Sequence, residues 1–347
     1  MSVSRVTPAG DVRQPVFDHL DRLSDGRGLF EHALHAVPRR EHGYCVDDVG
    51  RGLVVLGREP QPGPTVRRLS RRYLEFVLSA LDPDGSCHNR MDVDGQWRDE
   101  PGTGDWWGRA LWGLGVTAVS ARTPGMRARG LGGFRIAAQR RSPHVRSMAF
   151  AALGAAELLS TRPDELAARQ LLADALAAIG ELKADDHGWP WPEERLSYGN
   201  AAIAEALIVA GEALPDARAL DRGLSLLTFL LGAETRDGHL SVTPVGGRGP
   251  AEAGPGYDQQ PIEVAALADA CASAFRVTRE SGWLTGVSLA WHWFLGDNDS
   301  ATPMFDPRTG GGYDGLELGG RNLNQGAEST LAMLSTAQHA RWISELE

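Results

Sequence analysis

The 347-residue sequence lacks the features that would place it in several large functional classes. No apolar run is long enough to cross a membrane, and the polar segment 1–15 has no apolar core of the kind that secretory signals carry. We therefore expect a cytoplasmic protein without membrane insertion. Basic residues are outnumbered by acidic ones, 35 to 45, and the net charge is −10. Because phosphate contacts need a basic track, nucleic acid is not an expected partner.

Motifs for metals, cofactors and nucleophilic serines are also missing. The three cysteines, Cys45, Cys87 and Cys271, are widely spaced and form neither a disulfide framework nor a CxxC zinc pattern. The histidines have no HExxH spacing, no GxGxxG fingerprint follows a strand pattern, and no GxSxG motif is present. The sequence therefore predicts a protein with no metal and no cofactor.

What the sequence does contain is an alternation of two kinds of helix. Residues 166–179 carry apolar side chains at steps of three and four, which is typical of a helix with one buried face. Residues 106–119 are apolar on every side and include three glycines, which predicts a helix buried all round. Six polar or acidic clusters precede helices of the second kind: 44–48, 105–109, 142–146, 198–200, 258–263 and 324–328.

This alternation predicts a ring of helical hairpins with two concentric layers, in which amphipathic outer helices cover apolar inner ones. The six clusters would then meet at one mouth. Three long loops rich in glycine, proline and aspartate, at 82–104, 237–256 and 296–323, would surround it. No linker divides the chain, so we expect a single domain over residues 17–347 after a flexible segment, 1–16.

Carboxylates and aromatic rings dominate the clusters. Cleavage of a glycosidic bond needs two carboxyl groups, one protonated and one ionised, and a ring of helix starts can supply both environments. Aromatic side chains beside these acids suit the apolar faces of sugar rings. Each group also has a structural interpretation: Asp105 and Asp258 as helix caps, Glu263 and Glu328 as core residues paired with Arg109 or Arg321, and most tryptophans as core.

Five stretches carry a resemblance to a known group: 43–51, 108–115, 189–193, 258–263 (DQQPIE) and 324–330 (NQGAEST). They resemble a bacterial group of the six-hairpin glycosidase superfamily whose members stand alone or are joined to glycosyltransferases. The resemblance spans residues 17–339 and implies an all-α (α/α)6 toroid, hydrolysis of a saccharide and association with a glycosyltransferase. Similar sequences read Tyr-Asp-Asn at Tyr198-Gly199-Asn200 and carry an acidic pair at Gly104-Asp105. These departures imply a shifted substrate, or a site that binds without cleaving.

We therefore predict a glycoside hydrolase that acts on an oligosaccharide or glycoconjugate. The alternatives are a non-catalytic saccharide-binding or glycosyltransferase-accessory protein, and an isomerase, lyase or terpenoid cyclase of the same architecture. The predicted catalytic residues are Asp105 or Asp258 as base or nucleophile and Glu263 or, preferably, Glu328 as acid. The predicted substrate-binding residues are Tyr44, Asp47, Asp48, Trp106, Trp107, Arg109, His144, Trp189, Trp191, Glu194, Tyr198, Asn200, Gln259, Gln260, Asp314, Asn324 and Gln325.

Overall fold

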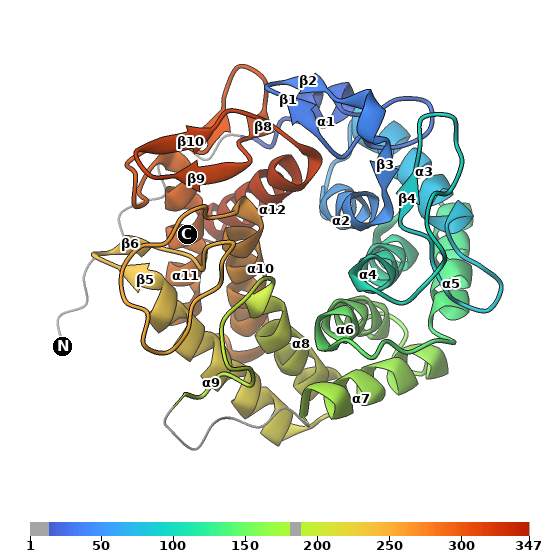
Figure 1. The fold of residues 1–347 in the computed structure, drawn as a ribbon. Coiled ribbons are helices and arrows are strands. Elements are labelled where there is room, and N and C mark those ends of the chain that lie inside the picture. Colours follow the sequence, from blue (N-terminus) through green and yellow to red (C-terminus); the bar gives the residue numbers. More distant parts are fainter. Residues whose placement is uncertain (1–13, 181–188, 347) are drawn as a thin grey trace.

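A ring of paired helices makes up the protein (Figure 1). The computed structural model describes residues 14–180 and 189–346, and within them twelve α-helices. The inner ring consists of α2 (Val46–Gly57), α4 (Asp105–Ser120), α6 (Val145–Leu159), α8 (Asn200–Ala213), α10 (Pro261–Thr278) and α12 (Ala327–Ser344). The outer ring consists of α1 (Asp18–Arg22), α3 (Pro64–Ser79), α5 (Pro124–Ala137), α7 (Leu166–Gly180), α9 (Ala217–Glu234) and α11 (Gly282–Leu295).

The two ends of the chain close the ring. Each inner helix packs against the next, and α12 packs against α2. The short helix α1 lies against α12, so the sixth hairpin combines the first and last helices of the described chain. The predicted all-α (α/α)6 toroid is confirmed. The sequence analysis overlooked α1, because five residues are too few to show a helical period.

Glycines allow the inner helices to pack backbone against backbone. A Cβ atom on Gly108 of α4 would lie 2.2 Å from the carbonyl oxygen of Ser147 on α6, and one on Gly115 would lie 2.3 Å from that of Gly154. On the other side of α4, a Cβ on Gly113 would lie 2.7 Å from the carbonyl oxygen of Gly50 on α2. Helix α4 is therefore held close to both neighbours, and its first turn has a fixed place at the mouth of the ring.

The outer helices bury one face each, as their sequence period predicts. In α3, Leu69, Tyr73 and Val77 are fully buried, whereas Arg71 and Glu75 are exposed. No helix in the described ranges is long and apolar enough to span a membrane.

Short antiparallel strand pairs lie in the loops around the N-terminal ends of the inner helices (Figure 1). They pair β1 (Ala33–Leu34) with β2 (Val37–Pro38), β3 (Tyr44–Cys45) with β4 (Arg90–Met91), β5 (Thr235–Arg236) with β6 (His239–Leu240), β7 (Phe305–Asp306) with β8 (Gly311–Gly312), and β9 (Gly315–Glu317) with β10 (Gly320–Asn322). Of the three predicted long loops, 82–104 and 296–323 supply residues that line the cavity at this end, and 237–256 does not. Most of the predicted flexible segment 1–16 lies outside the described residues.

Two predicted helix starts need correction. The N-cap of α10 is Gln260, so Asp258 precedes the helix and does not cap it. The N-cap of α4 is Gly104, which leaves Asp105 as the first helical residue, with a side chain free for other contacts.

Candidate functional site

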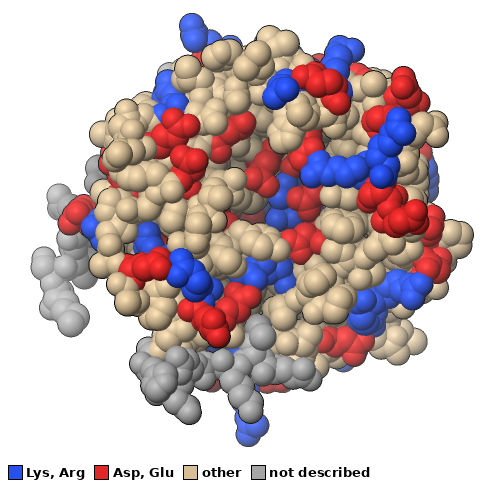
Figure 2. Space-filling view, in the orientation of Figure 1, with Lys and Arg blue, Asp and Glu red and all other residues tan. Residues whose placement is uncertain are grey.

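Two adjoining chambers lie at the N-terminal ends of the inner helices. The acidic chamber, of about 350 Å³, is lined by residues of α2, α4 and α12 and of the loops above them. The inner chamber, of about 240 Å³, extends toward α8 and α10. Together they form one cleft, because both are lined by Asp47, Arg51, Asp105, Gln260 and Glu328. Acidic and basic side chains gather around the centre of this face in Figure 2.

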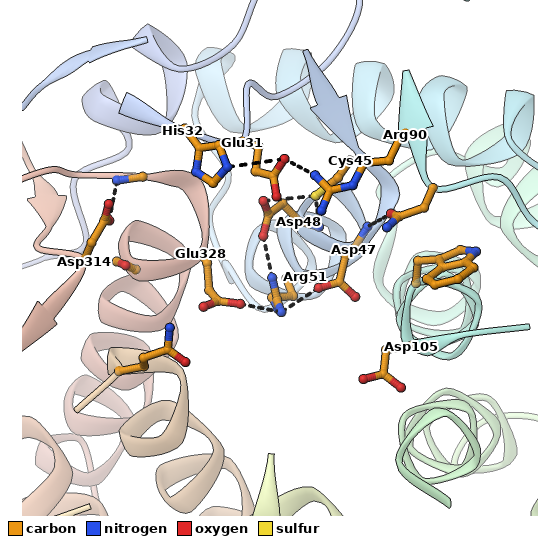
Figure 3. Close-up of a pocket in the computed structure, with 15 residues that line it drawn as sticks. Glu31, His32, Cys45, Asp47, Asp48, Arg51, Arg90, Asp105, Asp314 and Glu328 are labelled. Carbon is orange, nitrogen blue, oxygen red and sulfur yellow. Dashed lines mark hydrogen bonds and ion pairs between the residues drawn. The ribbon is translucent and has the colours of Figure 1, made fainter. Parts of the chain in front are cut away.

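Arg51 is the charged centre of the cleft (Figure 3). The helical spacing of α2 places Asp47 and Asp48 four and three residues before it, within reach of its guanidinium. Its Nη2 lies 2.6 Å from Asp47 Oδ2 and 2.6 Å from Glu328 Oε2, and its Nη1 donates to Asp48. Carboxylate oxygens of all three acids lie within 4.8 Å of one another, an arrangement that can also hold a cation. In this structure Arg51 supplies the positive charge there.

Asp48 differs from its neighbours in its burial. Its side chain also accepts a hydrogen bond from the Cys45 thiol, at 3.2 Å. Burial raises the pKa of Asp48 to about 7, although the Arg51 guanidinium acts in the opposite direction. One carboxyl of the cluster is therefore easily protonated near neutral pH.

Arg109 fixes the wall between α2 and α4. Its Nε lies 2.9 Å from Asp47 Oδ1, and its guanidinium lies 3.9 Å from the centre of the Phe150 ring. Arg109 and Phe150 are both buried, which strengthens the contact between the cation and the ring. Asp47 is thereby held between two arginines, Arg51 and Arg109.

Asp105 faces both chambers and forms no ion pair among the described residues. It accepts a hydrogen bond from the Ser147 hydroxyl, at 2.7 Å, and lies beside the Tyr198 phenol. Burial and this neighbouring carboxylate raise the pKa of Tyr198 to about 12. Asp105 is thus held by Ser147 on the first turn of α4, facing the cleft.

Glu263 lies on the first turn of α10 and lines the inner chamber. It accepts backbone N–H bonds from Gly199, at 2.6 Å, and Asn200, at 3.4 Å. Burial raises the pKa of Glu263 to about 7, and the charge of Glu234 adds to the rise. The Tyr198 phenol lies beside Asp105, and the backbone N–H of the next residue, Gly199, donates to Glu263, so consecutive residues of one loop lie against the two carboxyl groups.

The loops above α2 add residues that the sequence analysis missed: Glu31, His32, Asn89 and Arg90. Arg90 pairs with Glu31, and the imidazole of His32 lies 3.7 Å from the same carboxylate. No periodic pattern marks these loops, so their position was not accessible from the sequence. Arg51 was also missed, although its spacing from Asp47 and Asp48 is a recognisable pairing signal.

The structure brings ten of the predicted site residues into the cleft. Burial of Asp314, which lines the acidic chamber, raises the pKa of its carboxyl group. Glu328 was expected deep on its helix, but it is about one-third exposed and is paired with Arg51. The ten residues are Asp47, Asp48, Asp105, Trp106, Arg109, Tyr198, Gln260, Glu263, Asp314 and Glu328.

Three tryptophans that were predicted to bind substrate line neither chamber. Trp189 is partly exposed and packs edge-on against Phe229 of α9, whereas Trp191 is completely buried against the same ring. Trp107 is also completely buried and donates to the carbonyls of Gly85 and Ala137. Trp107 and Trp191 are therefore core residues.

Eight other predicted residues line neither chamber. Five are buried or half-buried and make structural hydrogen bonds: Tyr44 to Asp25, Asn200 with Ser197, Gln259 with Asp299, Asn324 with His35 and Gln325 with Thr309. Three are exposed outside the cleft: His144, Glu194 and Asp258. Of the five positions expected at one mouth, Asp48, Asp105, Tyr198 and Glu328 line the cleft, and Asp258 does not.

Comparisons with known proteins show the fold. No protein-family model matches the chain, and no curated protein matches it in sequence. A sugar epimerase from a ruminal bacterium is 14% identical with a TM-score of 0.71, over 95% of this chain and 98% of that one. A GH76 α-mannanase from Bacteroides thetaiotaomicron is 11% identical with a TM-score of 0.61, over 87% of each chain. A cellulase from C. cellulolyticum, solved with cellobiose, is 7% identical with a TM-score of 0.63, over 91% of this chain and 88% of that one.

Proposed function

We propose that this protein is a carbohydrate-active enzyme of the (α/α)6 toroid class, and specifically a glycoside hydrolase that acts on an oligosaccharide or glycoconjugate in the cleft. The solved structures compared above carry names of sugar-processing enzymes, among them a sugar epimerase, a mannanase and a cellulase. Their low sequence identity leaves the reaction to be argued from the cleft itself.

The observation that carries the proposal is the difference between two carboxyl groups of the inner chamber. Asp105 accepts a hydrogen bond from the Ser147 hydroxyl and lies on the first turn of α4, where the helix N-terminus favours a negative charge in general. Glu263 is buried, and its pKa is raised to about 7, so its protonated form is populated near neutral pH. Glycoside cleavage requires one ionised and one protonated carboxyl group.

These environments assign the roles. Glu263 is the general acid that protonates the leaving oxygen, and Asp105 is the base or nucleophile. This assignment departs from the sequence-based preference for Glu328 as acid, since Glu328 is paired with the Arg51 guanidinium and about one-third exposed. Glu328 and Asp47 instead accept hydrogen bonds from sugar hydroxyls at the boundary of the two chambers.

Two other functions have less support from the cleft. An epimerase would use a pair of histidines as bases, but His32 is the only histidine among the described residues that line the cleft. A binding protein without activity is the second candidate, and Arg51 favours it, because it pairs with three of the cleft carboxyl groups.

The test is a panel of oligosaccharides and aryl glycosides, assayed for binding and for released sugar. We expect release by the wild type and a loss of turnover by orders of magnitude in Asp105→Asn and Glu263→Gln. Asp258→Asn is the matched control, because Asp258 is exposed and lies outside both chambers. Binding without release in every assay would select the non-catalytic candidate, and an isomerised product would select the epimerase.

A further inference from the structure

A second, larger cavity lies at the opposite end of the ring. This far chamber has a volume of about 620 Å³ and is lined by the C-terminal parts of α6, α8 and α10 and by the residue that ends α2, Arg58. A void of about 30 Å³, more than half of whose lining residues are aliphatic, shares Arg51 and Arg109 with the cleft and Trp112 with the far chamber. The void holds little more than a water molecule, so a ligand in the far chamber is separate from one in the cleft.

The floor of the far chamber carries a polar group without a full set of partners. Glu205 of α8 is 4% exposed and lines the chamber. Its Oε1 accepts a hydrogen bond from Ser273, at 2.7 Å, while Oε2 has no hydrogen-bond partner among the described residues. Burial, together with the charge of Asp269, raises the pKa of Glu205 to about 7. Near neutral pH it is therefore a donor as well as an acceptor for a guest hydroxyl.

Beside this carboxyl group lies an apolar and aromatic wall. Trp112 of α4 lines the chamber, with the Arg58 guanidinium 5.7 Å from its ring centre. Arg58 is itself neutralised by Asp269, at 2.5 Å. An indole ring beside a buried hydrogen-bonding carboxyl is the combination that suits a polyol with apolar C–H faces.

The rim is basic. Arg169, Arg276 and Arg279 line the chamber, and no ion pair with a described residue neutralises them. Arg276 donates to Ser273, at 2.8 Å, and so links the rim to the floor. Two glutamates of the rim, Glu157 and Glu212, offset part of the charge of the three arginines, so the rim keeps a small net positive charge. An arginine fork matches the oxygens of a carboxylate or phosphate.

Arg279 occupies a costly backbone position. It ends α10 with φ 62° and ψ 14°, in the left-handed region where glycine is the usual residue. A side chain there costs about 1 kcal/mol relative to glycine. The structure thus carries a long cationic side chain at the rim in a position where glycine would be more stable, which points to a use for that side chain.

We propose that the far chamber binds a monosaccharide-sized polyol with one anionic group, the anion at Arg276 and Arg279 and the ring between Trp112 and Glu205. The chamber is in the size range of small-molecule sites. The site is independent of the proposed hydrolysis, and the cleft is a poor alternative for such a ligand because seven acidic residues and three arginines line it.

Isothermal titration of the full chain with glucose 6-phosphate tests the proposal, with glucose and inorganic phosphate as the neutral and the bare-anion probes. We expect one saturable site for glucose 6-phosphate and weaker binding of each part alone. Arg276→Ala and Arg279→Gly should each weaken binding about tenfold, the loss of one charge-assisted contact. Arg129→Ala is the control, since this exposed arginine of α5 pairs with Glu75 away from the chamber.

Arg279→Gly gives a second readout, because glycine adopts the left-handed conformation without strain. Its thermal midpoint should rise while its affinity falls, and a fold defect cannot produce that combination. Absence of saturable binding by the wild type, or wild-type affinity in both arginine variants, would overturn the proposal. A loss of binding in Asp105→Asn would place the ligand in the cleft and overturn it equally. These binding results can be interpreted in the same way whether or not the protein hydrolyses a glycoside.

Discussion

Replacing Arg51 by methionine removes the one cation that holds three carboxyl groups of the cleft together. Arg51 is 7% exposed, and Asp47, Asp48 and Glu328 all contact its guanidinium. Breaking a buried ion pair by removing one partner costs about 3–5 kcal/mol, because the remaining charge stays buried and uncompensated. We expect Arg51→Met to lower the free energy of unfolding by about this amount at neutral pH.

Lowering the pH should offset part of this loss in the free energy of unfolding. Without Arg51 the three carboxyl groups, within 4.8 Å of one another, repel, and their folded-state pKa values rise above those of the unfolded chain. Between the unfolded and folded pKa values the folded variant then binds more protons, so its stability falls as pH rises through that window. The difference from wild type should therefore be smaller near pH 5 than near pH 7.5.

Urea denaturation at both pH values measures these differences. Arg129→Met is the matched control, because Arg129 forms an exposed pair with Glu75, and such pairs contribute about 0.2–1 kcal/mol. A loss at Arg51 no larger than at Arg129, or one that does not shrink on acidification, would refute the central place of Arg51 in the cleft.

Three further predictions concern the acid, the core and the inner ring. Since the raised pKa of Glu263 is about 7, kcat/KM should fall above about pH 7, and the residual activity of Glu263→Gln should lack this limb. Trp191→Ala should cost about 3–5 kcal/mol of stability in urea denaturation and leave saccharide affinity unchanged, because the ring is fully buried outside the cleft. Gly108→Ala should destabilise by about 1–3 kcal/mol or more by the same assay, whereas Gly132→Ala, with no atom within 4 Å of the new Cβ, should not.

The fold was predictable because its signals are local and repeated. Residues 106–119 are apolar all round and residues 166–179 on one side, and these two patterns predicted the inner and outer rings. The short helix α1 has no such period, and its place in the ring depends on a contact with α12 at the other end of the sequence. No local pattern encodes that contact.

The site was most predictable where a residue lies on the first turn of an inner helix. Asp48, Asp105, Glu263 and Glu328 meet this condition, and all four line the cleft. Asp258 lies just outside its helix and lines neither chamber, although the spacing looked equivalent.

The positions of the remaining residues depend on packing partners and loop paths that are distant in the sequence. Trp191 is buried because Phe229, 38 residues further on, provides a ring against which it packs. Glu31 and Arg90 reach the cleft from loops whose paths no period describes.

The most direct test of the central claim is to follow the oxygen atom during turnover in ¹⁸O-labelled water. A hydrolase that works through Asp105 and Glu263 adds one labelled oxygen for each bond it breaks, at the anomeric carbon of the released sugar. We predict mass-resolved incorporation of one label per cleaved bond by the wild type, and its loss by orders of magnitude in Asp105→Asn and Glu263→Gln. Turnover to an unlabelled isomer, or full incorporation by both variants, would contradict the account.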